Sequence, residues 1–455
     1  METNNSFSDA PMLPLMIKMA APSIMAQMVN MFYSIVDRIY IGHIPDIGSK
    51  ALAGIGVCNA VIIVVAAFAQ FAGGGGAPLA AISLGSGKKD HAEAMLGNGA
   101  LVLLVLALLL TVPLYLFMDP LLYAIGASGN TITYAHEYLS VYLLGTVFVM
   151  ITIGLNPFVN AQGCPKTAML SVVIGAAINI ILDPVLIYGF NMGVSGAAIA
   201  TVVSQAVSAC WILRFLTSKS TFLRLRLSRL RPSIDILSAM LALGISPFIM
   251  ASTESLIGLI MNRGLSRYGD VYVSALAIMQ STMQFSAVPV TGFSQGAAPV
   301  LSFNYGNGDD GRLREGFRIL FVVMTAWNFI VTLCIMLMPK VFAGIFTSDV
   351  MLIDTVGKVM PVFMAGMTIF GMQRACQTTF VALNQPRTAI FIALLRKIFL
   401  LIPLAMILPH WFGVMGIYGA EAVADIIAAL SCMTIFFITF PRILAQNPNK
   451  KIVHV

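Results

Sequence analysis

The segment Pro22-Ser-Ile-Met-Ala26 recurs later in the chain as Pro247-Phe-Ile-Met-Ala251, and this repetition is the first indication of the fold. Three more pairs follow in the same order: Ala77-Pro78 with Gly85-x-Gly87 and Ala298-Pro299 with Gly306-x-Gly308, Pro165-Lys-Thr-Ala168 and Pro386-Arg-Thr-Ala389, and Gly193-Val-Ser-Gly196 and Gly413-Val-Met-Gly416. The offset between the copies stays between 220 and 225 residues. Four matches in one order at nearly one spacing indicate an internal duplication.

The composition places both copies in a membrane. Of the 455 residues, 58% are apolar and only 10% are charged, whereas a soluble domain carries about 25% charged residues. The 26 Lys and Arg and the 19 Asp and Glu are too few to cover a water-facing surface of this size, so lipid must cover most of it. We therefore expect an all-α, polytopic membrane protein.

Apolar stretches between Gly, Pro and charged residues predict about twelve transmembrane helices in two pseudo-symmetric six-helix bundles. The first set is expected near residues 12–40, 52–83, 94–118, 134–160, 166–189 and 195–216, and the second near 236–264, 271–305, 314–339, 352–383, 388–409 and 414–440. Because each copy has an even number of spans, the copies enter from the same side and form a parallel repeat. Such an arrangement suits a transporter with its site between two lobes.

A basic segment separates the two sets of spans. Its five cations, with no acid among them, are Lys219, Arg224, Arg226, Arg229 and Arg231. The positive-inside rule places this segment in the cytoplasm, and with it both termini. The predicted organisation is an N-lobe (1–216), a basic cytoplasmic linker (217–234), a C-lobe (235–441) and a cytoplasmic tail (442–455). The basic charge is interpreted as a topology signal, with binding to anionic lipid head groups as the alternative; it gives no indication of nucleic-acid binding.

Two acids of the first copy, Asp37 and Asp183, lie inside apolar spans. A charged carboxylate there costs at least about 2.5 to 3.5 kcal/mol on insertion scales, so its presence needs a reason. Asn179 precedes Asp183 by four residues and leaves the same face of a helix. Two carboxylates with amide and hydroxyl oxygens can share a proton or surround a small hard cation. The structural alternative is that Asp37 pairs with Arg38 and that Asp183 caps or kinks its helix.

Glu254 is the acid best placed inside a span of the second copy, and no base lies within four residues of it on its helix. We interpret it as a proton carrier or as an anchor for a cationic substrate; the alternative is a neutral carboxyl group bonded to a neighbouring helix. Possible counter-ions are Arg374, Arg396 and Lys397, although snorkelling to the helix end explains the last two equally well. Two weaker acidic candidates share a face nearer the end of the last span: Glu421 and Asp425.

The glycines at 73–76 and the segment Gly85-Ser-Gly87-Lys88 do not form a phosphate-binding loop. A Walker loop needs Gly, four residues and then Gly-Lys-Ser/Thr, but Ile82 occupies the first glycine position and Lys89 follows Lys88. These glycines are interpreted as sites of close helix contact or as a hinge. Without an ATP-binding segment, transport is expected to use an ion gradient.

Several segments together resemble the multidrug and toxic compound extrusion (MATE) family. They are Val36-Asp37-Arg-Ile-Tyr-Ile-Gly42, Leu84-Gly-Ser-Gly87, Asn160-Ala-Gln-Gly163-Cys-Pro165, Asn179-Ile-Ile-Leu-Asp183-Pro184 and Gly193-Val-Ser-Gly196-Ala-Ala-Ile-Ala-Thr201. The style of the sequence favours a bacterial, MepA-like branch. The resemblance implies two six-helix lobes that form a V and open alternately to either face. It also implies export of amphipathic, often cationic compounds in exchange for Na⁺ or H⁺.

The resemblance also implies roles for particular residues. The positions that match an N-lobe cation or proton site in similar members are Asp37, Asn179, Asp183 and Thr201, with Tyr138 as a supporting member of the network. Glu254 matches a seventh-helix glutamate that serves substrate or proton binding in other members. The tenth-helix aspartate of one bacterial branch has no counterpart, because residues 355–420 contain no acid. That departure puts a C-lobe cation site of that kind in doubt.

The expected function is therefore that of a multidrug exporter of the bacterial inner membrane, with Na⁺ or H⁺ as coupling ion and no other cofactor. Its expected partners are amphipathic cationic small molecules and membrane lipid, and the chain is expected to be a monomer. Two alternatives stay open: a flippase for a lipid-linked sugar, and an exporter of a single endogenous metabolite. An enzyme is not expected, because no nucleophile and base occur at a plausible spacing.

Overall fold

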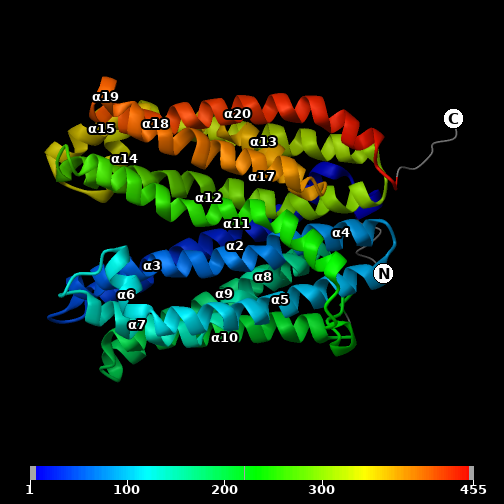
Figure 1. The fold of residues 1–455 in the computed structure, drawn as a ribbon, viewed down its shortest axis with the longest axis horizontal. Coiled ribbons are helices and arrows are strands. Elements are labelled where there is room, and N and C mark those ends of the chain that lie inside the picture. Colours follow the sequence, from blue (N-terminus) through cyan, green and yellow to red (C-terminus); the bar gives the residue numbers. More distant parts are fainter. Residues whose placement is uncertain (1–6, 220, 450–455) are drawn as a thin grey trace.

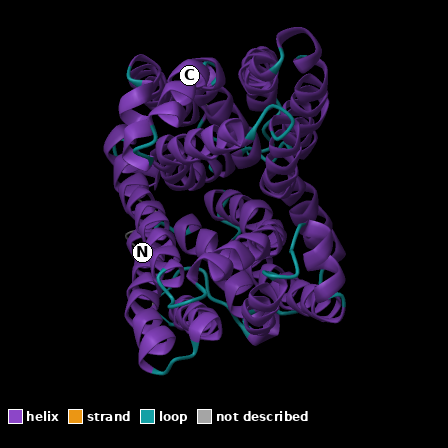
Figure 2. Cartoon of the chain, turned by 90° about the vertical axis from the view of Figure 1, so that its left-hand side faces the viewer, coloured by secondary structure: helices purple, strands orange, loops and turns teal. Residues whose placement is uncertain are grey.

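The computed structural model describes residues 7–219 and 221–449, and within these ranges the chain forms helices and no strand. The helices gather into two bundles, the N-lobe and the C-lobe, which lie one above the other in Figure 1 and are seen end on in Figure 2. The linker and the described residues nearest the two termini lie at one end of the molecule. The part of the expected tail from 450 to 455, with Lys450 and Lys451, lies outside the described residues.

The helices of the N-lobe follow the predicted spans. They are α2 (Met12–Gly42), α3 (Gly48–Gln70) continued by η1 (Phe71–Gly76) and α4 (Ala77–Gly85), α5 (Lys89–Leu116), the short α6 (Met118–Ile125), α7 (Ile132–Leu144), α8 (Thr146–Ala161), α9 (Pro165–Pro184) continued by η2 (Val185–Gly189), and α10 (Gly193–Thr217). A 3-10 turn, η3 (Leu227–Arg229), lies in the linker.

The helices of the C-lobe repeat this order. They are α11 (Ile234–Leu265), α12 (Asp270–Gly306), α13 (Asp310–Leu337), the short α14 (Pro339–Phe346), α15 (Val350–Met364), α16 (Met367–Ala382), α17 (Pro386–Leu394) continued by η4 (Leu395–Leu401), α18 (Ile402–Ile407) and α19 (Pro409–Phe412), and α20 (Val414–Ala445). The short helices α6 and α14 occupy corresponding places in the two lobes and were not expected from the apolar pattern.

In the described part of the chain, ten helical segments are long and apolar enough to cross a membrane, and an eleventh is added if α7 and α8, bent by 59°, form one span. The remaining predicted span, the eighth (271–305), forms α12, which is 37 residues long but does not meet that test. The polar residues Gln280, Gln284 and Gln295 interrupt its apolar pattern. Gln284 and Gln295 are exposed, and Gln295 accepts a 3.0 Å hydrogen bond from Gln27 of α2, while the rest of α12 packs against α2, α4 and α13.

Three spans contain a π-helical stretch that the sequence did not reveal. These are η1, η2 and η4, inside the second, fifth and eleventh predicted spans. In η2 the stretch follows Pro184 directly, since a proline has no backbone N–H to continue the ordinary ladder. π-helical stretches occur frequently at functional sites because they change the direction of neighbouring side chains.

The two lobes touch near the end that holds the termini. There α2 and α4 of the N-lobe pack on α12, and η1 packs on α11. The repeated glycines Gly85 and Gly306 make this contact reciprocal. A Cβ atom on Gly85 would lie 2.0 Å from the carbonyl oxygen of Phe303, and one on Gly306 would lie 2.0 Å from that of Ile82. The interpretation of Gly85 as a site of close helix contact is therefore confirmed.

This contact gives a test of how the lobes are held together. Gly85→Ala should lower the melting temperature of the purified protein, because the backbones of α4 and α12 must move apart. Gly258→Ala is the matched control, because Gly258 lies in α11 with open space where the Cβ would be. Ala is the better helix former by about 0.8 to 1 kcal/mol, so the control should be neutral or stabilising. Equal effects in a thermal-shift measurement would contradict the close-contact role.

The linker and the N-terminal segment each form polar contacts with a lobe at this same end of the molecule. Arg229 of the linker forms a 2.6 Å ion pair with Asp90 at the start of α5. From the other lobe, Arg312 of α13 donates hydrogen bonds to the backbone carbonyl oxygens of Phe7 (3.0 Å) and Ala10 (2.8 Å), which precede α2. The linker therefore docks on the N-lobe, and the N-terminal segment docks on the C-lobe.

Candidate functional site

Asp37 and Asp183 lie together inside the N-lobe. Asp37 lies on α2 and Asp183 on α9, two helices that pack side by side, and the two carboxyl groups interact directly with each other. Asp183 is fully buried. Among the described residues, Oδ1 of Asp37 and both carboxyl oxygens of Asp183 have no hydrogen-bond donor. The structure thus brings together two acids 146 positions apart in the sequence and leaves their oxygens available to a ligand.

The other predicted residues of the N-lobe surround this pair. Asn179, one turn before Asp183 on α9, is buried, and both polar atoms of its amide lack a partner in the described chain. Thr201 is buried on α10, which packs on α9. Tyr138 of α7 lies against Thr201, and Asp37 is its principal charged neighbour. The five residues therefore form one polar cluster, which we call the N-lobe chamber, while their function in cation binding stays a prediction.

Two tyrosines near the carboxyl pair were not among the predicted residues. Tyr33 lies one turn before Asp37 on α2 and interacts with both acids. Tyr188 of η2 donates a 2.5 Å hydrogen bond to the backbone carbonyl oxygen of Tyr40, and its ring is also close to Asp183. The spacing of four residues before Asp37 is a signal that identifies Tyr33 from sequence. Tyr188 has no such signal, because its position depends on the π-helical turn after α9.

The structure contains neither an Asp37–Arg38 ion pair nor a helix cap by Asp183 among the described residues, whereas the regular α9 ladder does give way to a π-helical stretch directly after Asp183 and Pro184. Arg38 points outward, and no cation of the described chain lies within the 4.0 Å of an ion pair to Asp37 or Asp183. Although α9 does end beside Asp183, at Pro184, no described backbone N–H bonds to the Asp183 carboxylate. Oxygen-rich sites of this kind suit a small hard cation or a shared proton.

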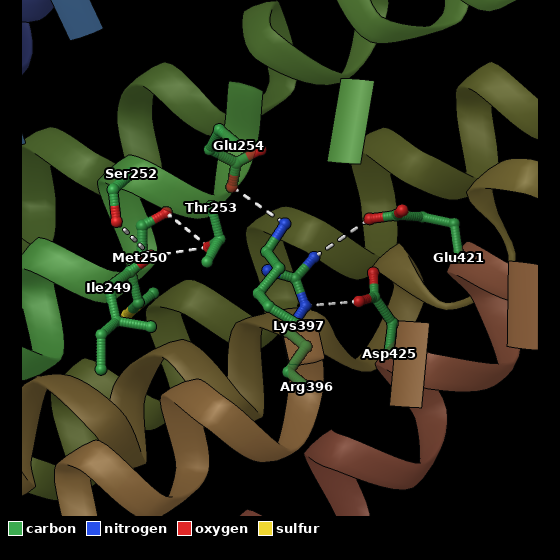
Figure 3. A network of polar contacts seen from close by, with 9 residues as sticks. All are labelled: Ile249, Met250, Ser252, Thr253, Glu254, Arg396, Lys397, Glu421 and Asp425. Atoms are coloured by element: carbon green, nitrogen blue, oxygen red, sulfur yellow. Dashed lines mark hydrogen bonds and ion pairs between the residues drawn. The ribbon is translucent and has the colours of Figure 1, made fainter. Parts of the chain in front are cut away.

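The C-lobe contains an ion-pair network of its own (Figure 3). Lys397 Nζ lies 2.9 Å from Oε1 of Glu254, Arg396 Nε lies 2.6 Å from Oδ1 of Asp425, and Arg396 Nη2 lies 3.3 Å from Oε1 of Glu421. Of the possible counter-ions named from the sequence, Lys397 pairs directly with Glu254, so Glu254 is not an unpaired acid. This partner comes from η4, which is distant in sequence from the helix of Glu254.

The alternative interpretation, that Arg396 and Lys397 snorkel to the helix end, is wrong, because their side chains are only 7% and 2% exposed. Both stand at the start of the π-helical stretch η4, which directs one toward α20 and the next toward α11. The ring of Phe370 lies 4.3 Å from the Arg396 guanidinium carbon. In the repeat, Glu421 corresponds to Thr201 of the N-lobe. The N-lobe thus has an open carboxyl pair where the C-lobe has a network of closed ion pairs.

An aromatic cluster joins the lobes below Glu254. Phe248 of α11 stacks on Phe71 of η1 at 4.9 Å between ring centroids and contacts Phe68 of α3 edge-on, also at 4.9 Å. All three rings are half-buried. Glu254 follows Phe248 by six residues, or about 9 Å along the helix. At about 100° per residue this spacing also sets the two side chains about 240° apart around α11, so that Phe248 meets α3 and η1 of the other lobe whereas Glu254 meets Lys397 of its own lobe.

The protein has two related six-helix lobes, which touch at one end, and each lobe contains buried ionisable groups. This arrangement is that of a polytopic membrane transporter built from a parallel repeat. The profile of the MatE family matches residues 22–185 and 247–407, one copy of the repeat each. The chain belongs to the MatE family. The family predicted from the quoted sequence motifs is thereby confirmed, and so is the duplication that begins at Pro22 and Pro247.

Curated relatives share nearly the whole length of the chain. "Multidrug export protein MepA" of Staphylococcus aureus (strain N315) is 24% identical over 446 residues, which cover 97% of both chains. The protein of the same name from Staphylococcus saprophyticus is 24% identical over 437 residues, which cover 95% of both. The expected similarity to a MepA-like branch is confirmed.

Solved structures share the fold. An outward-facing multidrug resistance MATE family transporter of the MOP superfamily superposes with a TM-score of 0.87 at 21% identity, over 95% of this chain and 96% of that one. A MATE structure in the bent conformation superposes with a TM-score of 0.90 at 22% identity, over 98% and 99%. The two-lobe, all-α fold predicted from the sequence is confirmed.

Proposed function

We propose that the protein is a cation-coupled multidrug exporter that moves amphipathic, often cationic compounds out of the cell. The observation that carries the proposal is the carboxyl pair Asp37–Asp183, buried between α2 and α9 with oxygens that no described donor satisfies. Buried ionisable groups inside a membrane protein mark ion or proton pathways when they have no structural partner. The relatives named multidrug export protein support the same conclusion.

In this proposal the coupling ion, Na⁺ or H⁺, binds at Asp37 and Asp183, with Asn179 and Thr201 as further oxygen ligands and Tyr138 as support. The carboxyl groups repel each other when both are charged, so a bound cation or proton draws α2 and α9 together. The same helix α2 packs on α12 of the other lobe. Ion capture thereby favours one arrangement of the lobes, and coupling requires that the drug binds the two arrangements with different affinity.

The proposed drug site has two parts along α11: the Glu254 carboxylate and, about 9 Å away along the helix, the aromatic cluster of Phe68, Phe71 and Phe248. The carboxylate attracts a positive group, and the rings pack against the apolar part of the same molecule and attract its charge. Half of the Glu254 side chain is exposed although protein surrounds it, so a ligand can reach it. The many methionines and phenylalanines, 28 of each, supply adaptable walls for varied ligands.

The proposed setting is the bacterial inner membrane, with both termini and the linker in the cytoplasm, and a monomeric chain surrounded by lipid. The linker supports this orientation, because five Lys and Arg follow one another there without an acid. The lobes touch at the linker end, so the proposed orientation makes this structure closed toward the cytoplasm.

A lipid-linked sugar flippase, the alternative, needs free cations to bind a pyrophosphate group. The buried cations Arg396 and Lys397 are instead neutralised by Glu254, Glu421 and Asp425. An exporter of one endogenous metabolite differs from the proposal only in its cargo, and a panel of compounds separates the two.

Dye efflux from cells that express the protein tests the proposal. Cells loaded with a fluorescent cationic dye should lose it faster than cells with an empty vector. An ionophore that collapses the sodium or the proton gradient should abolish the difference. Efflux that continues after both gradients are collapsed would contradict ion coupling, and failure to expel any cationic dye would favour the flippase.

A further inference from the structure

The two partners of the Glu254–Lys397 ion pair differ in exposure. The side chain of Glu254 is 52% exposed, whereas that of Lys397 is 2% exposed. A ligand can therefore touch the carboxylate but not the ammonium group. Lys397 stands behind Glu254, inside the lobe, and its charge acts on anything that binds to the carboxylate from the accessible side (Figure 3).

Lys397 has little freedom to leave Glu254. In the described chain Glu254 is the acid that lies within ion-pair distance of Lys397. Glu421 attracts Lys397 as well, but it is already bonded to Arg396, together with Asp425. Withdrawal of Lys397 would leave a buried, unpaired ammonium group, which is costly in a low-dielectric interior.

Other cations add to the same field. Arg396 and Arg374 both act on the Glu254 carboxylate in addition to Lys397. The three acids and three cations of this cluster cancel in formal charge. The N-lobe chamber differs, because its two carboxyl groups have no cation in ion-pair contact within the described residues. The C-lobe site therefore attracts a positive charge much less strongly than an exposed carboxylate without neighbouring cations would.

We propose that Lys397 is a built-in counter-ion that sets the affinity of Glu254 for cationic substrates. This inference rests on the proposed function, since it takes Glu254 as the contact for the substrate's positive charge. A substrate cation must share the carboxylate with an ammonium group that cannot leave, and two like charges a few ångströms apart repel each other more strongly there than in water. The lysine thereby keeps binding weak enough for release, which a transport site requires. It is a positioning and specificity residue and does not touch the substrate.

Equilibrium binding to the purified full-length protein tests this role with two probes of similar shape. Tetraphenylphosphonium is a lipophilic monocation, and triphenylphosphine oxide is neutral. Lys397→Met should bind tetraphenylphosphonium about tenfold more tightly than the wild type, with little change for the neutral probe. Lys397→Arg is the matched control and should behave like the wild type. In the double variant Glu254→Gln, Lys397→Met, the gain for the cation should disappear.

Three results would overturn the inference: an unchanged cation affinity in Lys397→Met, an equal change for both probes, or a gain that persists without the Glu254 carboxylate. Lys397→Gln is the second variant if the methionine variant does not fold. The outcome is separable from the proposed function. A wild type that binds tetraphenylphosphonium with no effect of Lys397→Met removes only this inference, whereas a wild type that binds neither probe removes both.

Discussion

Asp183→Asn should abolish ion-driven drug efflux while the protein remains inserted and folded. The substitution keeps the size of the side chain but removes the charge that the coupling ion must balance. Coupling free energies between two ligands are typically about 1 to 3 kcal/mol, so the ion-driven efflux rate should fall by about 5- to 150-fold. Stability should not fall, because a neutral amide is cheaper to bury than a carboxylate. Asp37→Asn should have the same effect, since the two carboxyl groups act as a pair.

A surface acid supplies the matched control for this experiment. Asp119→Asn changes the same residue type at a carboxylate that is 55% exposed and pairs with His136 outside the chamber. Its efflux should equal that of the wild type in a drug-resistance assay with matched expression levels. Undiminished resistance in both chamber variants would refute the role of the carboxyl pair.

Arg396→Met should destabilise the protein more than any other single substitution in the C-lobe network. It leaves the carboxylates of Glu421 and Asp425 buried without their shared partner. Loss of one member of a buried ion pair costs about 3 to 5 kcal/mol. The melting temperature in detergent and the yield of folded protein should both drop. Arg387→Met on α17 is the control, because that arginine is exposed and should tolerate the change.

The same network allows a rescue. Combining Arg396→Met with Glu421→Gln and Asp425→Asn removes all three charges and should recover most of the lost stability, because neutral amides can be buried at lower cost. No recovery in the triple variant would mean that Arg396 acts through packing on Phe370 rather than through its charge.

Much of the fold follows from the sequence because lipid imposes a simple rule. A span needs about 20 apolar residues, and Gly, Pro and charge mark its ends, so the twelve predicted ranges coincide with helices of the structure. The internal duplication further predicted that these helices form two related lobes. Apolarity could not predict η1, η2 and η4, since π-helical stretches depend on local hydrogen bonding and packing.

The N-lobe chamber was predictable because its residues are acids or amides in apolar surroundings, where each is costly. Asp37, Asn179 and Asp183 stand out for that reason, and the resemblance added Thr201 and Tyr138. The members of the C-lobe network were named from the sequence as acids and possible counter-ions, but which cation pairs with which acid was not predictable, because the pairs join α11, η4 and α20 across long stretches of chain. From sequence, the adjacent cations Arg396 and Lys397 resemble residues at a helix end. In the structure the π-helical stretch directs them toward different helices.

Flux through proteoliposomes, with the sodium and proton gradients imposed separately, tests the central claim most directly. The account predicts that one of the two gradients drives cationic dye transport by the wild-type protein, and that the double variant Asp37→Asn, Asp183→Asn transports no more dye than liposomes without protein. Gradient-driven transport at the wild-type rate in that double variant would contradict the account.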